Sequence, residues 1–125
     1  MNTLDLLLKT NLNALKLPEM NVKINRLSEA TGEDVIFTVR ALRFDKLEEL
    51  RECNEKNSDF QAMVLLNGVA SPDLKSPELK EKLNAGTPVE TVKKLLLAGE
   101  IEDLYVKISK LSGFGADTIE EIKKK

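Results

Sequence analysis

The side chains best suited to chemistry in this chain are its carboxylates, which in pairs can transfer protons. Adjacent pairs fall in segments predicted to be helical: Glu48 with Glu49, Glu102 with Asp103, and Glu120 with Glu121. Neighbouring residues of a helix point about 100° apart, so such a pair does not converge on one substrate bond. We therefore interpret these pairs as solvent-exposed carboxylates, some of which lie in the first turn of a helix, where the helix dipole stabilises negative charge.

The chain lacks residues that nucleophilic catalysis and metal binding commonly use. The chain has no histidine, which removes Ser-His and Cys-His activation and the commonest transition-metal ligand. The single cysteine, Cys53, falls on an apolar helical stripe, so we expect a buried, unreactive thiol. Without a second cysteine there is no internal disulfide, which fits a reducing cytosol.

The fragment Gly113-Phe114-Gly115 follows a predicted helix and lacks the third glycine of a dinucleotide loop, so a helix C-cap explains its glycines. The sequence therefore predicts a non-enzymatic protein with no catalytic residue, no cofactor, no metal site and no small-molecule substrate.

Net charge and hydropathy limit the classes of partner that the chain is expected to bind. The formal net charge is -2, which argues against a nucleic-acid partner, because phosphate binding needs a clustered basic surface. The lysine run Lys123–Lys125 is interpreted as a solvated cation run near a helix C-terminus. No apolar stretch approaches the ~20 residues of a membrane span, and no secretory signal is visible.

Length and pattern predict one α+β domain over residues 1–125: one antiparallel β-hairpin packed with about five short helices, the C-terminal half being mostly helical. Residues 1–17 read as a short N-terminal helix or arm, with Thr3 capping a helix over residues 4–9. Residues 116–125 read as a flexible tail, in which Asp117 and Glu120 alternatively cap a last short helix.

Period-two alternation predicts the hairpin. Val22 and Ile24 form one strand, residues 35–39 form the other, and residues 28–34 turn between them. Leu27 and Ile36 fall out of phase, which a bulge or a partly covered second face would explain.

Capping signals and apolar spacing predict the helices. Asp45 begins one that ends near Asn54, and residues 60–70 form a buried helix, although periodicity alone does not separate this run from a strand. Ser76 and Pro77 begin a helix that Gly86 ends. The strongest start signal is Thr87 with Pro88 and Glu90. The last long helix begins at Glu100 and carries an apolar stripe that must pack on the core or on a partner: Ile101, Leu104, Tyr105, Ile108 and Leu111.

Several blocks together resemble the XkdN-like phage tail assembly chaperones. The resemblance covers roughly residues 20–115. In chain order the blocks are VKINRL at 22–27, VIFTVRAL at 35–42, NGVASPDLKSPEL at 67–79, the leucines 95–97 followed by Gly-Glu-Ile at 99–101, and Leu-Ser-Gly-Phe at 111–114.

The resemblance implies a protein that binds the tape measure protein during tail morphogenesis, until tail tube protein replaces it. It also implies self-association as a homo-oligomer and action in the bacterial host cytoplasm. Candidate protein-binding residues are those without an obvious core use: Leu97, Phe114, Ile119 and Ile122. The alternative for these four is that they close the core. Alternative functions are a head–tail or tail-completion protein retained in the virion, and a small regulatory or enzyme-accessory domain.

Overall fold

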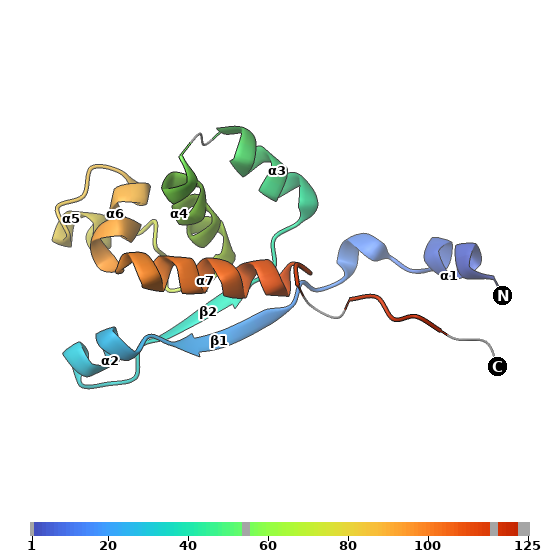
Figure 1. Cartoon of the computed structure of the whole chain (residues 1–125), viewed down its shortest axis with the longest axis horizontal. Helices are drawn as coiled ribbons and strands as arrows, with labels where there is room; N and C mark the ends of the chain where they lie inside the picture. Colours follow the sequence, from blue (N-terminus) through green and yellow to red (C-terminus); the bar gives the residue numbers. More distant parts are fainter. Residues whose placement is uncertain (1, 54–55, 116–117, 123–125) are drawn as a thin grey trace.

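The structure is a computed structural model that describes residues 2–53, 56–115 and 118–122. Within these ranges it has one three-stranded antiparallel sheet and seven α-helices, which confirms the predicted α+β class. Figure 1 shows the longest helix running across one face of the sheet, and residues 2–17 and 118–122 projecting from the same end of the body. The helices are α1 (Thr3–Lys9), α2 (Asn25–Thr31), α3 (Phe44–Cys53), α4 (Asn57–Gly68), α5 (Pro77–Lys82), α6 (Pro88–Leu95) and α7 (Ala98–Leu111).

The sheet has the order β1 (Glu19–Lys23), β2 (Ile36–Arg40) and β3 (Val69–Ser71). The β1–β2 pairing places Val22 opposite Phe37, as the alternation predicts. The third strand is absent from the prediction. It pairs with β2 across an irregular register, and only three residues form it, too few for a periodic signal.

The connection between β1 and β2 is helix α2, so the predicted simple turn is wrong. The Ser28 hydroxyl donates to the Ile24 carbonyl and accepts from the Val35 N–H, both at 2.8 Å, which ties α2 to the start of β2. Gly32, at a φ of 80°, ends the helix. Leu27 is out of strand phase because it belongs to this helix, and Ile36 because it lies 46% exposed on the outer face; neither marks a bulge.

The core is built around α4, which packs against α7, α6 and α3. The helix predicted over residues 60–70 is confirmed as far as Gly68, whereas Val69 and Ala70 belong to β3. Ala62, Val64 and Leu65 are almost fully buried. A Cβ placed on Gly68 would lie 2.7 Å from Cδ1 of Ile108, a side chain that is itself fully buried. Glycine at this position therefore allows α4 and α7 to approach closely.

Hydrogen bonds to capping side chains fix where several helices begin. At α6 the Thr87 hydroxyl accepts from the Glu90 N–H at 3.1 Å, and the Glu90 carboxylate accepts from the Gly86 N–H at 2.6 Å. Helix α5 ends at Lys82, before the predicted stop at Gly86, and Asn84 takes the left-handed conformation with a φ of 54°.

Helix α7 begins at Ala98 instead of Glu100. Gly99 lies inside its first turn, and the Leu97 N–H donates to the Glu100 carboxylate at 2.7 Å.

Both chain ends differ in detail from the prediction. The cap of α1 is Asn2, whose side chain accepts from the Asp5 N–H at 2.8 Å, and not Thr3. Residues 118–122 are not helical, so the predicted last helix is wrong for this range; Asp117 and Lys123–Lys125 lie outside the described residues. Among the helices described, none has the length and apolarity to cross a bilayer.

Candidate protein-binding surfaces

The four candidate binding residues are all exposed. The exposed fraction is 57% for Leu97, 53% for Phe114, 92% for Ile119 and 84% for Ile122. The alternative that these side chains close the core is therefore wrong. Their role in binding another protein stays a prediction.

The structure divides these residues between the two ends of α7. Leu97 directly precedes the helix, and Phe114 follows it, so about 21 Å of helix separates them. At the far end Gly113, at a φ of 103°, reverses the chain, and the Phe114 N–H donates to the Ser109 carbonyl at 3.0 Å. Ile119 and Ile122 lie on the segment that continues outward from there (Figure 1).

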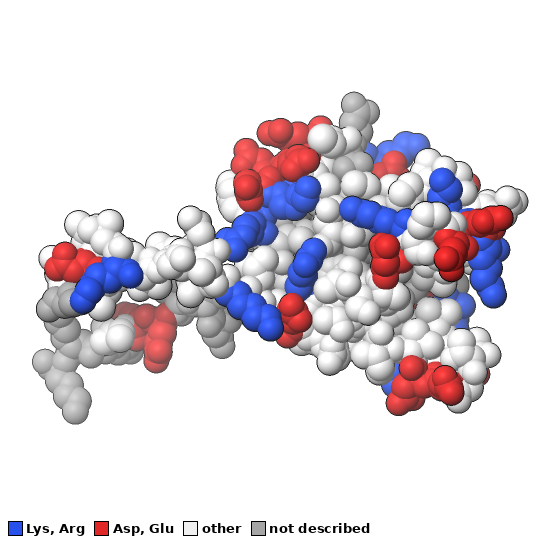
Figure 2. Space-filling view, turned by 180° about the vertical axis from the view of Figure 1, so that it is seen from behind, with Lys and Arg blue, Asp and Glu red and all other residues white. Residues whose placement is uncertain are grey.

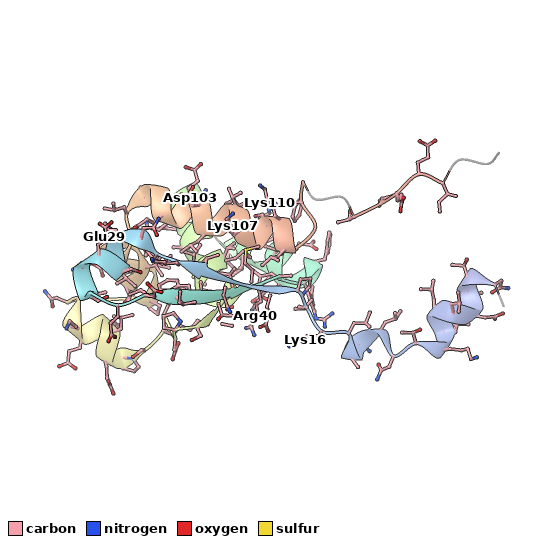
Figure 3. The ribbon with its side chains drawn as sticks, turned by 90° about the horizontal axis from the view of Figure 1, so that it is seen from below. Lys16, Glu29, Arg40, Asp103, Lys107 and Lys110 are labelled. Atoms are coloured by element: carbon pink, nitrogen blue, oxygen red, sulfur yellow. The ribbon has the colours of Figure 1, made fainter. Side chains whose placement is uncertain are left out.

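A larger apolar surface lies on residues 2–17, which we call the N-terminal arm. None of the residues in α1 or in the following turn, Leu12–Ala14, is buried. The arm projects from the same end of the body as the C-terminal segment, in both side-on views (Figures 1 and 3). Leu17 is half-buried, and the other six leucines of the arm are 47% to 74% exposed: Leu4, Leu6, Leu7, Leu8, Leu12 and Leu15.

Sequence reasoning did not place these leucines among the candidate site residues. A signal was present, because Asn11, Asn13 and Pro18 interrupt the leucine pattern and separate it from the rest of the chain. A leucine-rich helix that is cut off from the core in this way has an unpartnered face.

An apolar groove lies at the opposite end of the body, between α2, β2, α5 and the end of α6. We call it the α2–α5 groove; its volume is about 500 Å³. Apolar side chains form most of its wall, which also includes half-buried Ser76, and Thr31 and Asp73 lie exposed at its rim. The apolar lining residues are Leu27, Val35, Phe37, Pro72, Leu79 and Leu95.

A second hollow, of about 400 Å³, lies between β1, the start of α2 and α7. Arg26 and Glu100 meet across it, with Nη2 of Arg26 2.9 Å from Oε1 of Glu100 and 2.8 Å from the Leu95 carbonyl oxygen. The hydrogen bond from Arg26 holds the pKa of Glu100 below its ordinary value, and the same bond raises the pKa of Arg26. Since both partners satisfy one another, the pair ties α2 to the α6–α7 junction.

Charge elsewhere is mixed in sign. Figure 2 shows acidic side chains gathered over α3 and basic side chains spread among them and across the body. Asp103, Lys107 and Lys110 lie along α7 at helical spacing (Figure 3). On the other side of the core Lys93 pairs with Asp59, and this hydrogen bond lowers the pKa of the Asp59 carboxyl.

The residues considered for chemistry are dispersed over the surface. Cys53 is exposed, so the expected buried thiol is wrong: α3 packs on the core through Leu50 and partly through Leu47, while both of its ends reach solvent. Glu48, Glu49, Glu102 and Asp103 are exposed as well. Among the described residues there is no group of three or more Cys, Asp or Glu that could hold a metal ion.

Comparison with known proteins gives a family and a fold relative. The family model of the phage XkdN-like tail assembly chaperone proteins matches residues 4–123 of the chain. The crystal structure of the protein YqbN, a structural genomics target, superimposes with a TM-score of 0.62 at 27% identity. That match covers 79% of this chain and 89% of YqbN. The comparison with curated proteins returns no match.

Proposed function

The chain belongs to the XkdN-like family of phage tail assembly chaperones, and from this premise we propose that it binds the tape measure protein while the tail is being built. The observation that carries the proposal is the family match, which runs from residue 4 to residue 123 and so includes the arm, the body and the outward C-terminal segment. The proposed role is non-enzymatic and is carried out in the host cytoplasm.

The distribution of exposed apolar side chains supports this proposal. Of the fourteen large hydrophobic side chains that are exposed among the described residues, nine lie on the arm or at Phe114, Ile119 and Ile122, outside the packed body. A chaperone for a helix-rich client needs apolar surface of this kind, because such clients present amphipathic faces. Binding by a few exposed side chains is also weak enough to allow release when tail tube protein takes over.

Co-expression with the cognate tape measure protein tests the proposal. We expect the tape measure protein to be insoluble alone, to become soluble with the chaperone, and to co-purify with it. A tape measure protein whose soluble yield does not change, and which does not co-purify, contradicts the proposal.

Point variants test the candidate residues separately. The changes Phe114→Glu, Ile119→Glu and Ile122→Glu alter no buried contact, so the fold is expected to persist. Phe44→Glu is a matched control, because Phe44 is 82% exposed and lies on α3, outside both terminal segments. If these residues bind the client, the three-residue variant loses co-purified tape measure protein and the control does not. Leu97→Glu tests the other end of α7 in the same assay.

Mass spectrometry of purified phage particles separates the chaperone from a tail-completion protein. An assembly chaperone leaves before the particle is complete, so its peptides are expected in cell lysates and absent from particles. A constant copy number in the particle would instead identify a retained structural protein. Self-association, which we also propose, is developed below in terms of particular surfaces.

A further inference from the structure

We propose that the N-terminal arm of one molecule docks in the α2–α5 groove of a second copy. The inference does not depend on the identity of the client. It starts from two surfaces of the same chain that each lack a partner: a leucine-rich helix with no buried residue, and an apolar groove of about 500 Å³.

The shape and chemistry of the two surfaces match. Leu4, Leu7 and Leu8 share one face of α1, because residues three and four apart lie side by side on a helix. The helix is about 10 Å long, so these leucines form a short apolar surface. The groove offers apolar side chains from α2, β2, α5 and α6, and its exposed polar side chains are Thr31 and Asp73. Burying the leucines there removes apolar surface from water on both sides.

Charge at the rim agrees with this arrangement. Asp73 is exposed at the groove and Lys9 is exposed in the last turn of α1. Neither side chain belongs to an ion pair within the part of the chain that the structure describes. An arm seated in the groove would bring a cation to the Asp73 carboxylate, which accepts a hydrogen bond from the Lys75 N–H at 2.9 Å.

The way the arm leaves the body favours a second copy over the groove of the same molecule. The Ala41 N–H donates to the Pro18 carbonyl at 2.9 Å, which fixes the root of the arm at the start of β1. Leu17 precedes a proline and is therefore biased toward extended backbone. Figures 1 and 3 show the arm continuing away from the body, whereas α2 and α5 lie at its opposite end.

Because the arm and the groove lie at opposite ends, docking between copies is head-to-tail. Each molecule then offers one free arm and one free groove, so the contact does not close on itself in a dimer. The assembly is expected to grow with protein concentration.

The experiment uses full-length chains and static light scattering after gel filtration over a concentration series. The arm variant carries Leu4→Glu, Leu7→Glu and Leu8→Glu. The groove variant carries Thr31→Arg, which places a long charged side chain at the rim without removing a core residue. Leu79→Glu serves as a second groove variant, provided that circular dichroism shows that it folds. Phe44→Glu is again the control, because it removes an exposed apolar side chain elsewhere.

We expect the wild type and the control to exceed the 14.0 kDa chain mass increasingly with concentration, and each variant alone to stay monomeric. The decisive sample is an equimolar mixture of the arm variant and the groove variant. It contains one working arm and one working groove, so it should form a one-to-one dimer and nothing larger. A monomeric wild type, variants with the wild-type mass, or a mixture that stays monomeric would overturn the proposal. Loss of client binding by the groove variant with an unchanged mass would assign the groove to the client instead.

Discussion

Replacing Gly68 by alanine gives the sharpest test of how the body holds α7 in place. The new Cβ would lie 2.7 Å from Cδ1, 3.0 Å from Cγ2 and 3.1 Å from Cγ1 of Ile108. Ile108 is fully buried, so it has no solvent-filled space into which to move. Overpacking of this kind costs about 1–3 kcal/mol, whereas the helix preference for alanine over glycine returns at most about 1 kcal/mol.

We therefore expect Gly68→Ala to lower the free energy of unfolding by about 1–2 kcal/mol. Urea unfolding followed by far-ultraviolet circular dichroism measures this change, which suits a chain with no tryptophan. Gly99→Ala is the matched control, because Gly99 also lies in a helix but has no atom within 4 Å of an added Cβ. It should be neutral or stabilising by up to about 1 kcal/mol.

A second-site change checks that Ile108 is the cause. Ile108→Val removes Cδ1, the nearest atom, and alone costs about 0.5–1.5 kcal/mol. Combined with Gly68→Ala, it should destabilise by clearly less than the sum of the single changes. If Gly68→Ala instead stabilises the protein as Gly99→Ala does, the close packing of α4 on α7 is refuted.

Three further predictions concern a cap, an ion pair and the thiol. Thr87→Ala removes the α6 cap and should cost about 1 kcal/mol in urea unfolding, while Thr87→Ser should not; equal losses would contradict the capping role. Because the pKa of Glu100 is lowered in the folded state, the stability from its bond with Arg26 is present above the ordinary glutamate pKa and lost as the pH falls through the folded value. Glu100→Gln should therefore destabilise at neutral pH and converge with the wild type in acid; a constant difference would contradict this. Cys53 should react with a maleimide in the native protein, and labelling only after unfolding would contradict its exposure.

Local chemistry made some elements predictable. The start of α6 is encoded within four residues, where Thr87 caps the helix, Pro88 presets its first φ and Glu90 accepts a backbone N–H. The α4 segment is predictable as a helix because its apolar run shows no clean strand alternation, but its end at Gly68, directly before β3, is not predictable. Strands β1 and β2 followed from alternation with β-branched residues.

Elements defined by long-range contacts were not predictable. Helix α2 has seven residues, and it is held by the Ser28 hydroxyl, which accepts from the Val35 N–H, and by the pairing of Arg26 with Glu100. No periodicity in the sequence signals these contacts. Strand β3 exists because the chain after α4 runs beside β2. The prediction of a buried Cys53 rests on its continuing the stripe of Leu47 and Leu50, but a stripe does not reveal where the neighbouring helix ends, and Cys53 is exposed.

The candidate protein-binding surfaces could be predicted only in part from the sequence. Phe114, Ile119 and Ile122 stood out as apolar residues without a core use, and they are exposed. The arm leucines were interpreted as an N-terminal helix or arm, yet whether such a helix folds back onto the body depends on the direction in which Pro18 leaves the sheet. The groove could not be anticipated, because its walls come from segments up to 68 residues apart, from Leu27 to Leu95.

The most direct test of the chaperone account is the amount of tape measure protein that co-purifies with each variant, per mole of chaperone. The account predicts wild-type amounts for Phe44→Glu and a large loss when Phe114, Ile119 and Ile122 are all changed to glutamate, with unchanged circular dichroism. Equal amounts from both variants would contradict the claim that these exposed apolar side chains hold the client.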